Sequence, residues 1–117
     1  MPISRIHGPA IGRSLVSVHA GLVYAVSYDP RSADGITAQT KNALEFLDEN
    51  LAKAGSSKSV FLQATVYLSD MSMKAQMDEV WCEWIGPKDN WPQRACVGAD
   101  LGDNITLIEI VVIAAQS

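Results

Sequence analysis

The sequence lacks several features that would assign it to a particular class of protein. Its 117 residues contain two cysteines, Cys82 and Cys96, and no CxxC pair, which excludes a disulfide scaffold. No apolar run approaches the ~20 residues that a membrane-spanning helix needs. Residues 1–5 lack the apolar core of a signal peptide. We therefore expect a soluble protein of the reducing cytoplasm, with no membrane partner.

Basic residues and metal-ligand patterns are also scarce. Nine Lys and Arg against 13 Asp and Glu give a net charge of −4, and the basic residues form no cluster. A nucleic-acid binder usually carries a basic patch, so we expect no nucleic-acid partner. The two histidines, His7 and His19, have no ligand at metal-binding spacing. The glycine-rich phosphate-binding motifs are absent, and we predict neither a metal nor a cofactor.

The composition that is present fits one globular domain. The chain is 48% hydrophobic and 19% charged, which excludes a disordered or low-complexity protein. A chain of this size can bury roughly 65% of its unfolded surface. No internal repeat and no linker-like stretch divides it. We predict a single domain over residues 1–117.

The first half of the chain is predicted to form three strands and a helix. Residues 1–13 indicate a short strand and an irregular loop, and residues 14–27 indicate two strands joined by a hairpin at 19–21. Residues 29–35 have turn composition. A helix follows, with Asp34 or Thr37 as a cap at its start and Gly55 at its end. Its apolar positions recur at helical spacing at Ala43, Leu44, Leu47, Leu51 and Ala54.

The second half is predicted to add three strands and a second helix. Residues 60–68 alternate as a strand does, and one face contains Val60, Leu62, Ala64, Val66 and Leu68. The second helix follows residues 69–72, with apolar positions at Met73, Met77, Val80, Trp81 and Trp84. Residues 93–99 and 105–115 are the last two strands.

This order, βββαβαββ, predicts an α+β fold: a two-layer sandwich of a six-stranded mixed sheet with two helices on one face. The strand over residues 105–115 is apolar on both faces, so both faces need cover. Two helices can cover only one face of such a sheet. We therefore expect the other face to meet a second copy of the chain in a homo-oligomer.

Glu109 is the most unusual residue, because it lies inside the most apolar run of the chain. A buried carboxylate is costly unless it is paired or hydrogen-bonded. It is either a functional acid or a structural group, and a structural Glu is either satisfied within the chain or exposed at an interface. Arg94 is its candidate partner, and the period of two places Arg94, Cys96 and Gly98 on one face that the glycine leaves open. From spacing alone, Arg94 is better interpreted as an ordinary strand-end arginine in solvent, and Cys96 as a small buried hydrophobe rather than a nucleophile.

Together these residues resemble the C-terminal signature of the Rid family, the reactive intermediate deaminases also called the YjgF family. Pro92, Arg94 and Cys96 stand in the family's Pro-x-Arg-x-Cys pattern, and Glu109 follows Arg94 by the family's fifteen residues. The upstream half also fits, including Gln39 and the run over residues 64–70. The resemblance extends from about Val16 to Ala114.

The resemblance implies a chorismate-mutase-like fold, a homotrimer, and ligand clefts between its subunits. Well-studied members hydrolyse enamine and imine intermediates, such as 2-aminoacrylate, to 2-keto acids and ammonia. Carried over to this chain, Arg94 holds the carboxylate of a small metabolite, the backbone beside Cys96 positions the imine, and catalytic Glu109 activates water. This chemistry needs only an oriented acid and an aimed water.

The sequence also departs from the family pattern. Ser14 stands where active members have Tyr, Ser27 is followed by Tyr28 instead of Gly, and Asp78 replaces a frequent Asn. Ser14, Ser27 and Tyr28 are therefore candidate pocket residues of a divergent subfamily. The alternative to a deaminase is a non-catalytic trimer that binds small carboxylic acids. RNA cleavage, which is attached to some relatives, is disfavoured by the acidic charge.

Overall fold

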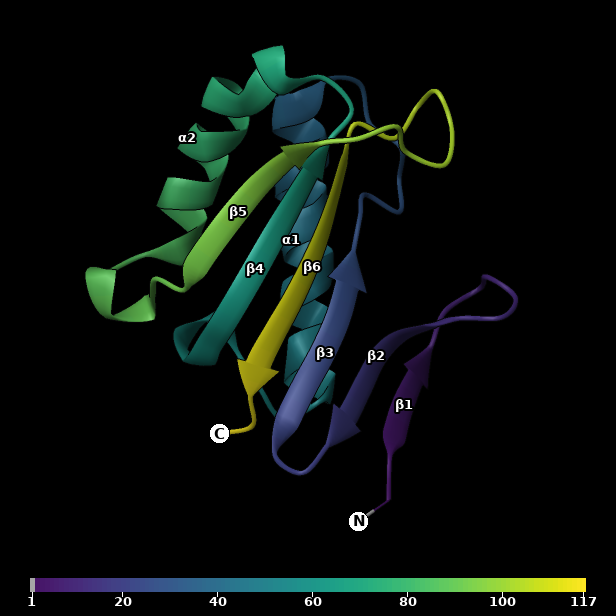
Figure 1. The fold of residues 1–117 in the computed structure, drawn as a ribbon, viewed down its shortest axis with the longest axis vertical. Helices are drawn as coiled ribbons and strands as arrows, with labels where there is room; N and C mark the ends of the chain where they lie inside the picture. The colour runs from purple at the N-terminus through teal and green to yellow at the C-terminus, as the bar shows by residue number, and fades with distance from the viewer. Residues whose placement is uncertain (1) are drawn as a thin grey trace.

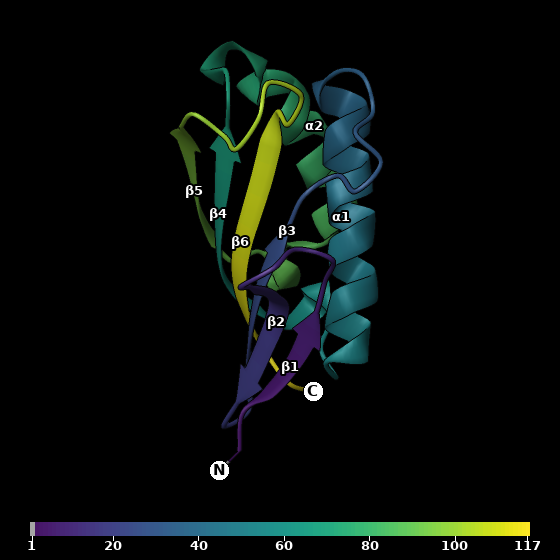
Figure 2. The same cartoon turned by 90° about the vertical axis from the view of Figure 1, so that its right-hand side faces the viewer.

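A computed structural model describes residues 2–117, and Met1, the first residue of the predicted opening segment, lies outside the described residues. The chain folds into a sheet layer and a helix layer, as Figures 1 and 2 show. The strands are β1 (Ser4–His7), β2 (Ser14–His19), β3 (Leu22–Ser27), β4 (Phe61–Leu68), β5 (Gln93–Gly98) and β6 (Ile108–Ala115). The helices are α1 (Ile36–Lys53) and α2 (Lys74–Ile85), with 3-10 turns at Lys58–Val60, Met71–Met73 and Lys88–Asn90. The predicted order and fold class are confirmed.

The six strands form one mixed sheet in the order β1-β2-β3-β6-β4-β5. Every neighbouring pair is antiparallel except β4 and β5, which are parallel. The parallel pair requires a crossover connection, and α2 provides it. Strand β6 lies between β3 and β4, so it joins the two halves of the sheet. Both helices cover the same face, and the opposite face is open (Figure 2).

Local sequence explains most element ends. Ala20 and Gly21 both have positive φ, 52° and 80°, which is the geometry of the tight hairpin predicted between β2 and β3. Gly55 follows the C-terminal end of α1 and has a φ of 77°. A residue with a side chain would be strained at this φ, so a glycine suits the end of the helix. The predicted cap by Asp34 or Thr37 is wrong. Gly35 is the N-cap and no side chain caps the helix; the carbonyl of Gly35 accepts the N–H of Gln39.

Two predicted strand positions are also wrong. The last strand begins at Ile108, not at residue 105, because the Asp103 carboxylate accepts the N–H groups of Ile105 and Thr106 in a turn. In β4 the pairing register shifts at its first residues. Phe61 is therefore buried and Leu62 is exposed, the reverse of the predicted alternation.

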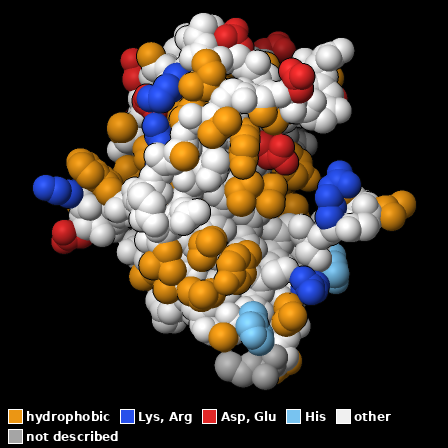
Figure 3. All heavy atoms as spheres, viewed as in Figure 1, with side chains coloured by type: hydrophobic (Ala, Val, Ile, Leu, Met, Phe, Trp, Pro, Cys, Tyr) orange, Lys and Arg blue, Asp and Glu red, His pale blue; other side chains and the backbone are white. Residues whose placement is uncertain are grey.

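The core lies between the sheet and the two helices. Its helix-facing side chains on β6 are buried: Ile108, Ile110, Val112 and Ala114. The intervening β6 side chains point to the open face, where Val111 is 38% exposed and Tyr24 of β3 is 44% exposed. Hydrophobic side chains gather on this open face (Figure 3). The two helices therefore cover one face only, as the apolar pattern of β6 indicated.

Candidate functional site

A cavity of about 420 Å³ opens on the helix-free face, between the loop after β1 and the loop before β6. Its polar lining comes from Arg13, Ser14, Tyr28, Asp103, Thr106 and Glu109. Three of the candidate residues, Ser14, Tyr28 and Glu109, therefore meet here although they lie far apart in the sequence. The antiparallel order β2-β3-β6 brings them together.

Glu109 lies on the open face of β6, opposite Tyr67 of β4. Its neighbours Ile108 and Ile110 point the other way, into the core. Glu109 is half-buried, and its carboxylate makes no hydrogen bond or ion pair within residues 2–117. The carboxylate therefore has its acceptor capacity free for water or a ligand in the cavity.

Arg94 lies on the other face of the sheet. It pairs with Ala64 of β4, whose side chain is buried beneath the helices. Its guanidinium donates to Oδ1 of Asp78 on α2 at 2.6 Å and lies 5.2 Å from the ring centre of Trp81. The sequence suggested Glu109 as the partner of Arg94, but within this chain the partner is Asp78. Within this chain, Arg94 and Glu109 do not line the same cavity.

Asp78 is the centre of a small charged network. Nζ of Lys74 donates to its other oxygen at 2.7 Å, so two cations share one carboxylate. Partial burial alone would raise the pKa of Asp78, but the hydrogen bonds from Lys74 and Arg94 outweigh it and lower this pKa. The three charges sum to +1, so the cluster can attract one further anion.

Cys96 and Gly98 share the helix-facing side of β5 with Arg94, as the alternation predicted. Burial raises the pKa of the Cys96 thiol, against the opposing effect of Arg94 and Lys74, so the thiol is protonated near neutral pH. This is not the environment of an activated nucleophile. The expected open space at Gly98 is absent, because a Cβ there would lie 3.0 Å from Cγ of Met71.

Ser27 and Tyr28 are placed differently, although they are adjacent. The Ser27 side chain is fully buried, and its hydroxyl donates to the carbonyl of Ala43 in α1 at 2.7 Å. It therefore anchors α1 and does not line the cavity. Tyr28 lines the cavity, and its ring meets Phe46 edge to face at 5.7 Å between ring centres. The wall at Tyr28 is thereby fixed to the helix layer.

Two further residues near the cavity were missed by sequence reasoning. Arg13 lines it from the loop after β1. His7, at the end of β1, lies with its Nδ1 3.1 Å from the Ser14 hydroxyl. The contact between His7 and Ser14 results from the pairing of β1 with β2, and no local sequence motif predicts it. The only available signal was the apolar alternation of residues 14–18, which does not fix the register of β1.

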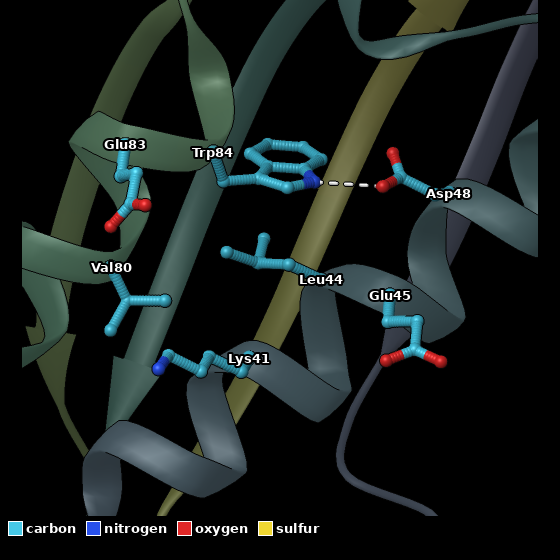
Figure 4. Close-up of a pocket in the computed structure, with 7 residues that line it drawn as sticks. All are labelled: Lys41, Leu44, Glu45, Asp48, Val80, Glu83 and Trp84. Carbon is cyan, nitrogen blue, oxygen red and sulfur yellow. Dashed lines mark hydrogen bonds between the residues drawn. The ribbon is translucent and has the colours of Figure 1, made fainter.

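A second hollow, a groove of about 330 Å³, lies between α1 and α2 on the helix layer. Figure 4 shows Trp84 and Leu44 in this groove, with the indole Nε1 donating to Asp48 at 2.9 Å. Lys41, Glu45 and Glu83 also line it. None of the candidate residues lies here, and no nucleophile is paired with a base in the groove. It is a less suitable site for the predicted chemistry than the open-face cavity.

The described part of the chain shows no cluster of three or more His, Cys, Asp or Glu side chains that could hold a metal ion. None of its helices is both long and apolar enough to cross a membrane.

The two-layer α+β fold, with six strands in one mixed sheet and both helices on one face, is that of the YjgF family structures. The family model described as Endoribonuclease L-PSP matches residues 15–116. The chain therefore belongs to this family, which confirms the Rid and YjgF resemblance.

Individual relatives match over nearly the whole chain. A RutC family protein of Haemophilus influenzae is 40% identical over 97% of this chain and 98% of its own length. The RutC family protein YoaB of Escherichia coli K12 is 34% identical, over 98% and 99% respectively. The crystal structure of NMB1025 from Neisseria meningitidis, a member of the YjgF family, has a TM-score of 0.92 and 31% identity, and the match covers 100% of this chain and 97% of that one.

Proposed function

We propose that this protein is a Rid-type deaminase that hydrolyses small 2-imino acids and their enamine precursors to 2-keto acids and ammonia. The observation that carries the proposal is Glu109: a carboxylate without a protein partner, on an otherwise apolar strand, facing a cavity of about 420 Å³. A carboxylate kept free in such a place is suited to accept a proton from water. The resemblance of Arg94 and Glu109 to the Rid signature supports the same reaction.

The proposed active unit is a homotrimer with a cleft between subunits. Arg94 lies on β5, the edge strand of the sheet, and Glu109 lies on the opposite, open face. A second copy packed on the open face would place its own β5 edge beside the cavity. Arg94 of one subunit and Glu109 of another would then act on one ligand. This arrangement explains why an apolar face is left uncovered in the single chain.

The chemistry that follows is simple. The imine carbon is already electrophilic, so catalysis requires an oriented substrate and a positioned water. Arg94 can hold the substrate carboxylate through the donors that Asp78 does not use. Glu109 then takes a proton from the attacking water. Both cysteines are free, so the protein suits the reducing cytoplasm, where we place the reaction.

The test is to generate 2-iminobutyrate in solution with an amino-acid oxidase and to follow its disappearance with and without the protein. We expect the protein to increase the hydrolysis rate well above the spontaneous rate. An unchanged rate at micromolar protein would refute the deaminase proposal. A boiled sample and the Glu109→Gln variant are the controls.

A second candidate function, binding of a small carboxylic acid without turnover, is favoured by the Asp78–Arg94 ion pair. Asp78 already occupies one edge of the guanidinium, and Ser14 replaces the phenol of active relatives. Calorimetry with 2-oxobutyrate separates the two: binding without imine hydrolysis identifies a binding protein. RNA cleavage, which the family's description suggests, fits poorly with a net charge of −4.

A further inference from the structure

We propose that His7 and Ser14 form a proton relay that serves the cavity of Glu109. Ser14 is the catalytic residue that touches the substrate nitrogen, and His7 is a positioning residue that acts through Ser14. The inference rests on the proposed deaminase function and adds the source of the proton that the imine nitrogen takes when water attacks.

The first observation is the hydrogen bond between the Ser14 hydroxyl and Nδ1 of His7, 3.1 Å long. Nδ1 can accept this bond when the ring is neutral and donate it when the ring is protonated. Either direction orients the hydroxyl. Ser14 is half-buried, and it lines both the cavity of Glu109 and the hollow that contains His7.

The second observation is the geometry of β1. The pairing of β1 with β2 runs regularly from Ser4–Val18 to Ile6–Val16, and then shifts so that His7 pairs with Ser14. Regular pairing would have placed His7 opposite Leu15. Irregularities of this kind re-aim side chains and are common beside active sites. Here the shift is what brings the imidazole to the hydroxyl.

The third observation is that His7 has a distinct set of charged neighbours. Arg5 and Arg13 line the hollow of about 700 Å³ that contains His7, and Arg5 donates to the Ser17 hydroxyl at 2.7 Å. Asp103 and Glu109 line the cavity on the other side of Ser14. The Asp103 carboxylate is committed to its own turn, where it accepts bonds from Ile105 and Thr106. Glu109 is therefore the carboxylate of this group that is free to act as a base, and the His7 imidazole is the group placed to pass a proton to Ser14.

The steps balance. In the attack, water gives a proton to Glu109 and its oxygen bonds to the imine carbon, while the C=N electron pair takes a proton from Ser14. Protonated His7 restores that proton through Nδ1. When the amino alcohol collapses, its hydroxyl proton returns through Ser14 to His7, and the departing nitrogen takes the proton held by Glu109. The 2-keto acid and ammonia leave, Glu109 is again a carboxylate, and His7 is again protonated.

The relay requires protonated His7, so it predicts a dependence of rate on pH. The enzyme-dependent rate should therefore fall as the pH rises and the imidazole loses its proton. Removing the imidazole should lower the rate and abolish this part of the profile. Binding of the keto-acid product should change little, because neither His7 nor Ser14 is assigned to the carboxylate.

The experiment compares His7→Asn, Ser14→Ala and the matched control His19→Asn, each assayed for hydrolysis of 2-iminobutyrate from pH 5.5 to 8.5. His19 is the other histidine of the chain, and it lines neither hollow; its ring nitrogen lies 3.4 Å from the Pro2 carbonyl. Asn can keep the hydrogen bond to Ser14 but cannot titrate. We expect His7→Asn and Ser14→Ala each to lose roughly 10²-fold in rate. In both variants the fall of rate with rising pH should be absent, and His19→Asn should match wild type.

The possible results distinguish a failure of the His7–Ser14 relay from a failure of the deaminase proposal. An active wild-type protein whose His7→Asn variant keeps the full rate and the same pH profile overturns the relay alone. A wild-type protein that never exceeds the spontaneous rate overturns the relay together with the deaminase proposal. Calorimetry with 2-oxobutyrate and thermal melts on the same variants show whether a loss of rate comes from lost binding or folding, and either of these results also overturns the relay.

Discussion

The ion pair between Arg94 and Asp78 predicts a measurable coupling between strand β5 and helix α2. Arg94 is 17% exposed and Asp78 is 30% exposed, so the pair is neither fully solvated nor fully buried. Exposed pairs contribute about 0.2–1 kcal/mol, and breaking a buried pair costs about 3–5 kcal/mol. We expect a coupling free energy of about 1 kcal/mol. This value is near the range of exposed pairs, because water still reaches Asp78.

A double-mutant cycle of Arg94→Ala and Asp78→Asn measures this coupling directly. The free energy of unfolding is taken from urea denaturation at pH 7 and at one fixed protein concentration, since association stabilises the folded chain. Lys74→Met is the matched comparison. Lys74 bonds the same carboxylate but is 44% exposed, so its coupling with Asp78 should be smaller, about 0.3–0.5 kcal/mol.

The pH dependence gives the same prediction an independent check. The folded-state pKa of Asp78 is lowered, so its contribution is present above the unfolded pKa, near 3.9, and is lost as pH falls through the folded value. Asp78→Asn should therefore flatten the stability curve below about pH 4. A cycle coupling below about 0.3 kcal/mol, with an unchanged acid limb, would show that the contact does not stabilise the fold.

Other predictions concern the site, the assembly and the core. Glu109→Gln should lower the imine hydrolysis rate by roughly 10²–10⁴ while 2-oxobutyrate still binds; a destabilised but fully active variant would mean that Glu109 is structural. Arg94→Ala should weaken calorimetric binding of 2-oxobutyrate by about 2–5 kcal/mol, and unchanged affinity in a folded variant would remove Arg94 from the site. Light scattering should give about three times the 12.6 kDa chain mass, and a monomer mass would contradict the intersubunit cleft. Leu47→Ala should cost about 2–5 kcal/mol in urea denaturation, because Leu47 is fully buried.

The sequence was sufficient for the fold because its strands and helices have clear apolar periods. The stripe from Ala43 to Ala54 became the buried face of α1, and the alternation of β6 became one buried and one open face. The errors occurred where polar groups replaced sheet or cap interactions. The Asp103 carboxylate accepts the N–H of Ile105, which the last strand was expected to include. The N-cap of α1 is Gly35, and no side chain caps the helix there.

The site was only partly predictable, for a different physical reason. The spacing of Arg94 and Glu109 makes both residues candidates for the site, but spacing along the chain does not say which face of the sheet each side chain occupies. The faces depend on strand order, which places β6 between β3 and β4 and leaves β5 at the edge. His7 and Arg13 were missed because their relation to the cavity depends on the register of β1, and no periodic pattern in so short a strand determines it.

The central position of β6 has a consequence for how the chain acquires its structure. The β1-β2-β3 meander and the β4-α2-β5 unit have no strand pairing with each other except through residues 108–115. During synthesis both pieces emerge before β6 exists, and each then exposes an unpaired strand edge, of β3 and of β4. These edges are hazards for association with other nascent chains. Formation of the whole sheet must wait for β6, so a substitution that weakens β6 should raise aggregation during synthesis more than its effect on the finished protein suggests.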